Sequence, residues 1–208
     1  MFLAIFCAAF ALYLRYLYNY LLSKVHRSYS YIGTGHDFEQ RFKDTERPSE
    51  FILQNSIQVF TDMFHCRVPH AYLDSGDNEE VDKITLKRFV KVAMQRATCL
   101  PQVRLFAWWK HLHLNTPISI TEGNSLFGGY FKVSIVTDQL IEITFTRQHI
   151  QGSITFTTKD TRTARQFFVQ TTMWGRPRTY SGIYRWSHEM VTMWVMKTAC
   201  DELTNISW

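Results

Sequence analysis

Motifs for catalysis and for zinc binding are missing from this chain of 208 residues. It contains no GxSxG, HExxH, P-loop or GxGxxG pattern, so no common hydrolase, metalloprotease or nucleotide-binding class has motif support. Its four cysteines include no CxxC pair and no Cys-His spacing typical of zinc. We therefore expect buried free thiols in a reducing compartment and no cofactor, and a non-enzymatic role is favoured over an enzymatic one.

Acidic residues are also missing from the N-terminal region, where none precedes Asp37. The flanking cations Arg15, Lys24, Arg27 and Arg41 all follow the first apolar residues, and the positive-inside rule then places the rest of the chain on the cytosolic or matrix side of a membrane. An acid-poor start that carries Arg and Tyr resembles organelle import signals in composition. We expect a mitochondrial location.

The N-terminal residues themselves form a long apolar run. Every residue from Phe2 to Leu14 is apolar or aromatic, and the apolar character resumes after Arg15. A helix of this length can cross a bilayer core, with Arg15 reaching the headgroups from one end. We predict a single-pass transmembrane anchor over residues 1–24. The alternatives are a buried core helix and a cleaved signal peptide, but the run lacks the basic start and small-residue cleavage site of a signal peptide.

The remainder has the composition of one folded domain. Hydrophobic residues make up 46% of the chain and charged residues 20%, while 15% are aromatic and can fill a core. We expect a connector over residues 25–48, including a short strand near residues 29–32, and a soluble domain over residues 49–208. The net charge of +5 suits an anionic neighbour such as a lipid surface or nucleic acid.

Two helices are expected at the start of this domain, followed by strands and a final helix. The first spans residues 50–65, and Asp82 caps the second, whose buried stripe is Leu86, Phe89, Val90, Ala93 and Ala97. Pro101 limits its C-terminal end. Ser187 caps the last helix, whose stripe is Met190, Val191, Trp194, Val195 and Ala199.

Alternating apolar residues after Pro101 predict an antiparallel sheet of about five or six strands. Residues 103–114 start it, and the alternation continues over 131–135, 141–145, 154–156 and 167–171. Polar breaks at residues 137–139 and 151–152 suit hairpin turns. The predicted fold class is therefore α+β, with the C-terminal helix packed on the sheet. This order of elements is loosely like START-type helix-grip folds or NTF2-like cones, which often enclose an apolar cavity.

Two histidines are the metal-binding candidates. His111 and His113 stand two residues apart in a predicted strand, so their imidazoles would share one face, with Glu122 or His149 as a third ligand. Surface histidines beside Trp108 and Trp109 are the alternative interpretation, and no metal is expected.

The strongest charge asymmetry predicts an anion-binding or partner-binding surface. Between Ile143 and His188 the only acidic residue is Asp160, and the cations include Arg162 and Arg165. The segment from Trp174 to Tyr180 sets Arg176 and Arg178 in a Gly/Pro turn flanked by aromatic rings, which can hold phosphates. The predicted site residues are Trp174, Tyr180, Arg162, Arg165, Arg176 and Arg178. Anionic lipid, a protein partner and RNA are the candidate ligands, in that order, and arginines that simply face water are the alternative.

These patterns together favour an accessory or assembly subunit of a larger membrane protein complex. The partners are then the lipid bilayer and the other subunits. Two other hypotheses stay open: a START-like or NTF2-like lipid-binding or lipid-transfer module, and a hydrolase or metal enzyme that uses the His111/His113 region.

Overall fold

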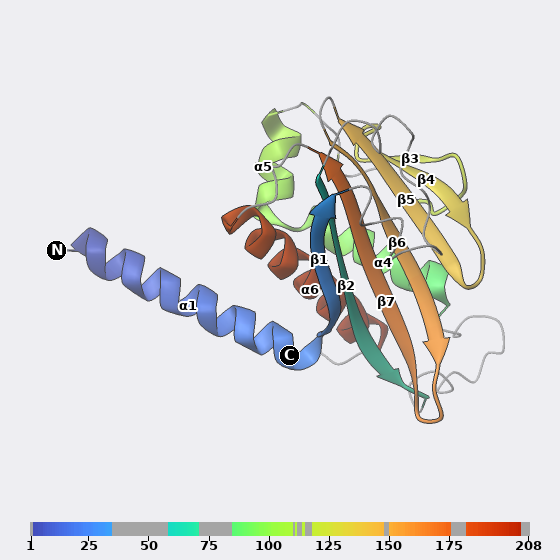
Figure 1. The fold of residues 1–208 in the computed structure, drawn as a ribbon, viewed down its shortest axis with the longest axis horizontal. Coiled ribbons are helices and arrows are strands. Elements are labelled where there is room, and N and C mark those ends of the chain that lie inside the picture. The colour runs from blue at the N-terminus through green and yellow to red at the C-terminus, as the bar shows by residue number, and fades with distance from the viewer. Residues whose placement is uncertain are drawn as a thin grey trace.

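Four α-helices and one seven-stranded antiparallel sheet make up the part of the chain that the computed structural model describes, which confirms the α+β class (Figure 1). The described residues are 2–34, 58–70, 85–109, 111, 114, 118–147, 150–175 and 182–204. The helices are α1 (Phe2–Lys24), α4 (Leu86–Thr98), α5 (Pro101–Trp109) and α6 (Ile183–Leu203). The strands are β1 (His26–Thr34), β2 (Gln58–Pro69), β3 (Ser125–Leu126), β4 (Phe131–Val136), β5 (Leu140–Arg147), β6 (Ile150–Asp160) and β7 (Ala164–Gly175).

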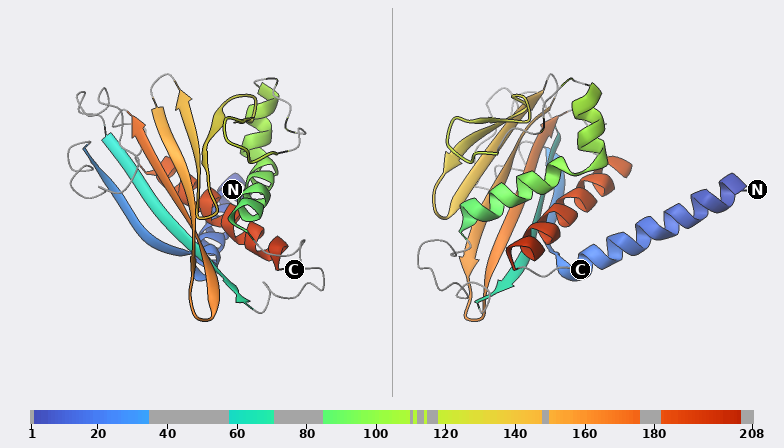
Figure 2. Two further views of the ribbon diagram at one scale, coloured as in Figure 1. Left: turned by 90° about the vertical axis from the view of Figure 1, so that its right-hand side faces the viewer. Right: turned by 180° about the vertical axis from the view of Figure 1, so that it is seen from behind.

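The sheet has the strand order β1-β2-β7-β6-β5-β4-β3, and every neighbouring pair is antiparallel. Strands β3 to β7 form a meander. The last strand of this meander, β7, pairs with β2, which joins the N-terminal strands to the C-terminal ones. Helices α4 and α6 cover one face of the curved sheet (Figure 2). The predicted packing of the C-terminal helix on the sheet is confirmed.

The core lies between this face and the two helices. Phe89 of α4 stacks on Phe167 of β7 with ring centroids 4.4 Å apart and planes tilted by 14°. Phe64 and Val169, which face each other across β2 and β7, are both buried here, and Met193 and Met196 approach from α6. Aromatic and aliphatic side chains thus fill the space between α4 and the sheet at this level.

Helix α4 confirms the second predicted helix, with a different cap. Thr85 is the N-cap, and its hydroxyl accepts a hydrogen bond from the Arg88 amide at 3.2 Å. Asp82, the predicted cap, lies outside the described residues. The stripe from Leu86 to Ala93 is buried as expected, and Ala97 is half-buried. The helix ends before Pro101, as predicted, because proline cannot continue the hydrogen-bond ladder.

The helix predicted over residues 50–65 is wrong where the structure describes it, because residues 58–65 belong to β2. Residues 50–57 lie outside the described residues. Strand β2 pairs with β1 and β7 along its edges, and both of its faces are covered at this level, since the consecutive residues Thr61 and Asp62 are fully buried. Val59 and Phe60 are therefore both fully buried although they point to opposite faces. A strand buried on both faces lacks the alternation of apolar and polar residues, so its apolar positions can match the spacing expected of a helix.

Residues 103–109 form α5 and not the predicted first strand. Pro101 occupies the first turn of this helix, where a missing amide costs nothing and the fixed φ suits a helix. Ala107 is buried and Val103, one turn earlier, is half-buried, so these two residues set the inward face. The segment 110–117 is described only at residues 111 and 114.

The predicted strands from residue 131 onward are confirmed, but one predicted turn is not. The turn at residues 137–139 joins β4 to β5, and the Thr137 hydroxyl accepts a hydrogen bond from the Leu140 amide at 2.9 Å. Gly152, predicted to lie in a turn, is inside β6. A β-carbon there would collide with the Phe145 ring and come within 2.6 Å of the Thr172 carbonyl oxygen. Glycine is therefore required for close packing at this point and not for a turn.

Helix α6 begins at Ile183, earlier than the predicted cap at Ser187, and Gly182 is its N-cap. Its buried face is also rotated from the prediction. Met193 and Met196 are fully buried, whereas Trp194 is half-buried. The helix packs against α4, α1 and β2, so contacts on several sides bury polar residues as well, and no single apolar stripe identifies its inward face.

The transmembrane anchor predicted over residues 1–24 is not supported. In the described part of the chain, no helix combines the length and apolar character needed to cross a membrane. Residues 2–24 do form one helix, α1, but Arg15 and Asn19 interrupt its apolar character before about 20 residues are reached. Its last turns join the domain instead, since Leu21 and the following Val25 are buried in the core.

Two of the described cysteines fit the expectation of buried free thiols. Cys66 of β2 and Cys200 of α6 are buried and unbridged, and Cys99 is exposed. Burial, with a smaller contribution from the neighbouring Cys200, raises the pKa of the Cys66 thiol well above its ordinary value. This thiol is therefore protonated and unreactive at neutral pH.

Candidate functional site

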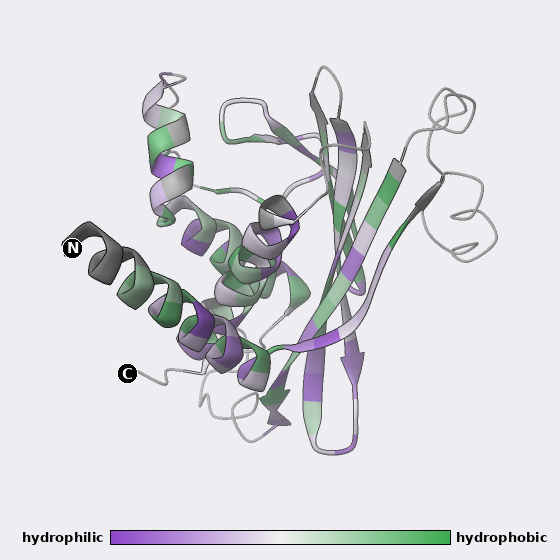
Figure 3. Cartoon of the chain, turned by 60° about the vertical axis from the view of Figure 1, so that its left-hand side comes forward, coloured by the Kyte–Doolittle hydropathy of each residue, from purple (hydrophilic) through white to green (hydrophobic). Residues whose placement is uncertain are grey.

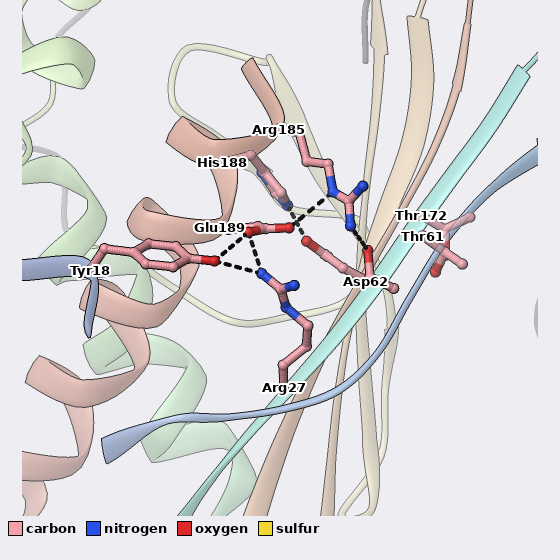
Figure 4. Close-up of polar contacts among 9 residues, drawn as sticks. Tyr18, Arg27, Thr61, Asp62, Thr172, Arg185, His188 and Glu189 are labelled. Atoms are coloured by element: carbon pink, nitrogen blue, oxygen red, sulfur yellow. Dashed lines mark hydrogen bonds and ion pairs between the residues drawn. The ribbon is translucent and has the colours of Figure 1, made fainter. Parts of the chain in front are cut away.

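A network of charged and polar side chains lies where α1, β1 and β2 meet the N-terminal part of α6 (Figure 4). Its centre is Glu189 of α6, which is 4% exposed. Tyr18 of α1 donates a hydrogen bond to Glu189 Oε2 at 3.0 Å, and Arg185 Nε donates to Oε1 at 3.0 Å. Arg27 of β1 forms an ion pair with the same carboxylate and also donates to the Tyr18 hydroxyl oxygen at 2.9 Å.

These contacts satisfy a charge that burial would otherwise make costly. Two guanidinium groups and one phenol surround the Glu189 carboxylate, and they come from three different elements. Burial, followed by the hydrogen bond to Glu189, raises the pKa of Tyr18, so the phenol remains a donor. Arg185 adds a further link, because its Nη2 donates to Ser30 Oγ of β1 at 3.0 Å. The network thus fixes α1 and β1 to α6.

Asp62 and His188 form a second part of the site, beside this network. Asp62 of β2 is fully buried, and neither of its carboxylate oxygens has a hydrogen-bond partner among the described residues. Its one charge partner there is His188 of α6, whose Nε2 lies 3.4 Å from Oδ2. The His188 ring also meets the edge of the Phe60 ring at 5.8 Å. The His188 side chain is 25% exposed and therefore connects a buried carboxylate to the surface.

The contact between Nε2 and Oδ2 is close enough for an ion pair when His188 is protonated, but it is not a hydrogen bond, because both atoms lack a hydrogen-bond partner among the described residues. A partly exposed imidazole next to a carboxylate is a common arrangement for proton transfer. Such an imidazole can act as a general base when a substrate lies within hydrogen-bond reach. Metal binding lacks equivalent support, because the described residues contain no cluster of three or more histidine, cysteine or acidic side chains.

The other face of the sheet carries a smaller polar pair at the same level. Thr61 and Thr172, opposite each other on β2 and β7, are both buried, and their hydroxyl oxygens lie 3.1 Å apart. The Gln170 amide donates to Thr172 Oγ1 at 3.3 Å. Because these hydroxyls are hydrogen-bonded within the sheet, they stabilise the pairing of β2 with β7 and are not free for a ligand.

The predicted arginine surface is only partly described, and its described members do not come together. Arg162 is exposed in the turn between β6 and β7, and Arg165 is held by Asp160 through two hydrogen bonds of 2.7 and 3.0 Å. Trp174 lies near the opposite end of β7, nine residues beyond Arg165 and therefore about 30 Å from it along an extended strand. The remaining predicted residues, Arg176, Arg178 and Tyr180, lie outside the described residues.

The strand predicted for the two histidines is wrong at His111, the one of the pair that the structure describes. His111 follows α5 in a turn with a φ of 53°, so it does not belong to a strand. Its amide donates to the Trp108 carbonyl at 3.2 Å and closes the end of the helix. Glu122 is exposed in another turn, and His113 and His149 lie outside the described residues.

Sequence reasoning missed the network around Glu189. Tyr18 falls within the predicted anchor, Arg27 among its flanking cations, and Asp62 within the helix predicted over residues 50–65. Glu189 is not among the predicted site residues. One available signal was the composition of α6, which has acidic and basic residues on every side and therefore no clean polar face. An amphipathic helix packed on one side only would not show this distribution.

Comparison with known proteins gave no match: no protein-family model, no curated protein and no solved structure matches this chain.

Proposed function

We propose that this protein is a non-enzymatic accessory or assembly subunit of a larger membrane protein complex, held there through the outer part of α1. The observation that carries the proposal is the contrast between the two ends of this helix. Its C-terminal turns are packed into the domain, whereas residues 8–13 are all exposed. Leu12 is 68% exposed and Tyr13 58%, and Figure 3 shows how α1 extends from the domain with hydrophobic residues along this part.

Exposure of so many apolar side chains to water is unfavourable in free energy. Apolar side chains at consecutive positions leave it no polar face, so it gains free energy when another surface covers it. The network around Glu189 holds the C-terminal turns of α1 and thereby fixes the direction of the helix. A rigidly presented apolar helix loses little entropy when it binds, and this favours a docking element over a loose tail.

The experiment is purification of the tagged full chain from native membranes in mild detergent, with identification of the proteins that accompany it. The test variant replaces Leu12 and Tyr16, one turn apart and 68% and 69% exposed, by glutamate. The matched control is Asn19→Glu, which adds a charge at an exposed polar position of the same helix. The accompanying proteins should be lost with the double variant and kept with the control. Recovery of the same proteins with both variants would contradict the proposal.

A second candidate function, an acid–base enzyme, is favoured by the pairing of His188 with Asp62. If His188 is a general base, hydrolysis of an activated ester such as p-nitrophenyl acetate should fall to the background rate in His188→Ala and decrease in Asp62→Asn. His65→Asn is the matched control, since His65 is another partly buried histidine of the same domain. Equal rates in all four proteins would remove this candidate.

A further inference from the structure

Helix α5 exposes a narrow apolar stripe. Leu105, Trp108 and Trp109 are 65%, 75% and 65% exposed, and their spacing of three and four residues places them on one face of the helix. The opposite face is anchored, since Ala107 and the preceding Leu100 are buried. The packing of the opposite face therefore keeps this apolar stripe of α5 directed away from the domain.

Two neighbouring tryptophans this exposed are unusual for a side that faces only water, because Trp buries more apolar surface than any other side chain. Their preferred surroundings are mixed: the ring gains from apolar contact while the indole N–H keeps a polar partner. The headgroup level of a bilayer offers both, and Trp and Tyr are enriched there.

The charges around the stripe favour an anionic lipid surface over an acidic or neutral protein groove. Neither α5 nor α1 contains an acidic residue, and each carries an exposed arginine, Arg104 and Arg15 respectively. Exposed Tyr13 and Tyr16 flank Arg15. Helix α5 and the outer part of α1 also lie on the same side of the sheet, the side that the helices cover (Figures 1 and 3). Both elements can therefore approach one membrane surface together.

We propose that Leu105, Trp108 and Trp109 insert into the headgroup region of an anionic bilayer and so orient the domain against the membrane. This inference rests on the proposed function, because it supplies the second point of contact that a subunit held through α1 needs to keep one orientation. Arg104 and Arg15 add electrostatic attraction to anionic headgroups, which added salt screens.

The test is sedimentation of the purified full chain with vesicles of phosphatidylcholine alone and of phosphatidylcholine with phosphatidylserine. Four proteins distinguish the contribution of α5 to vesicle binding from that of α1. They are the parent, Trp108→Ser with Trp109→Ser, Leu12→Glu with Tyr16→Glu, and the combination of all four changes. The double serine change should weaken binding to the vesicles that contain phosphatidylserine about a hundredfold, or about tenfold for each tryptophan removed, whether or not α1 is changed. The change of both tryptophans to tyrosine should retain most of the binding, and added salt should weaken it.

Equal sedimentation of the parent and the double serine variant would overturn the proposal, as would a parent that binds neither vesicle. The membrane-complex purification then separates the two ideas. If the double serine variant loses the accompanying proteins although the parent does not bind vesicles, α5 contacts a protein subunit, and the lipid inference fails while the proposed function stands. If the α1 variant keeps those proteins, the proposed function fails independently of the vesicle result.

Discussion

At the scale of single residues, the carboxylate of Asp62 is expected to lower the free energy of unfolding, so its presence calls for a role other than stability. A fully buried carboxylate with one imidazole at 3.4 Å, and no hydrogen bond among the described residues, has lost its hydration without full compensation. Glu189, the residue next to His188 in the chain, shows the contrasting case of a buried carboxylate with three donors. Groups held in such an unfavourable state mark candidate functional positions.

Substitution of Asp62 by valine should therefore stabilise the domain. Valine has a similar volume and suits a strand, and we expect the free energy of unfolding to rise by about 1–2 kcal/mol. His188→Ala should lower it by about 1–3 kcal/mol, since the carboxylate then stays buried without its partner. Urea denaturation measures both changes. A destabilised Asp62→Val protein would show that the carboxylate contributes to folding.

His65 predicts how stability changes with pH. Burial, and then the nearby charges of His26 and Arg67, lower the pKa of His65 in the folded state below its ordinary value of 6.5. The folded state thus favours the neutral ring. This contribution is fully present above about pH 6.5 and is lost as the pH falls through the lowered folded pKa. His65→Gln should reduce the loss of stability on acidification from pH 7 to pH 5, followed by urea denaturation at each pH. An unchanged pH dependence would contradict this assignment.

At the scale of elements, the Glu189 network decides how α1 and β1 are attached. Two further contacts between α1 and α6 act in the same place: Lys197 lies over the Tyr20 ring at 5.6 Å, and the Tyr18 and Trp186 rings are 6.0 Å apart. Leu21 supplies the apolar part of this attachment. The joint is thus built of charge, ring contact and apolar burial together.

Removal of the central carboxylate should loosen this joint. In Glu189→Ala, Arg27 and Arg185 lose their common partner and Tyr18 its acceptor, so we expect a loss of about 3 kcal/mol in the free energy of unfolding. Hydrogen exchange of the α1 and β1 amides should accelerate more than that of α4. Glu202→Ala is a matched control, because Glu202 pairs with Arg96 near the other end of α6 where both side chains are more than 40% exposed. Equal effects of the two substitutions would show that Glu189 is not a joint.

At the scale of the whole molecule, α1 has two parts with different roles. One is a structural element of the domain, and the other extends outward, so the protein has a rigid core with exposed apolar surface on α1 and α5. The mitochondrial location and the RNA alternative stay predictions, since no described feature bears on either.

Truncation should separate the two parts of α1. Removal of residues 2–14 should leave the free energy of unfolding within about 0.5 kcal/mol of the parent, because the described side chains of this segment are exposed or half-exposed. Removal of residues 2–24 deletes Tyr18 and Leu21 as well, and should cost about 3–5 kcal/mol or prevent folding. Circular dichroism during urea denaturation distinguishes these results. If the longer truncation were as stable as the shorter one, α1 would not belong to the core.

The sequence by itself determined the α+β class, the buried stripe of α4 and the meander from β4 to β7, because each depends on a local period that one covered face imposes. Only the tertiary structure decided that residues 58–65 form a strand, since β2 is covered on both faces and loses its alternation. It also decided the site: Tyr18, Arg27, Asp62 and Glu189 are far apart in sequence, and no local pattern records that α6 brings them together. The same holds for α1, whose apolar run has the composition of an anchor, while the burial of Leu21 depends on a helix more than 160 residues later.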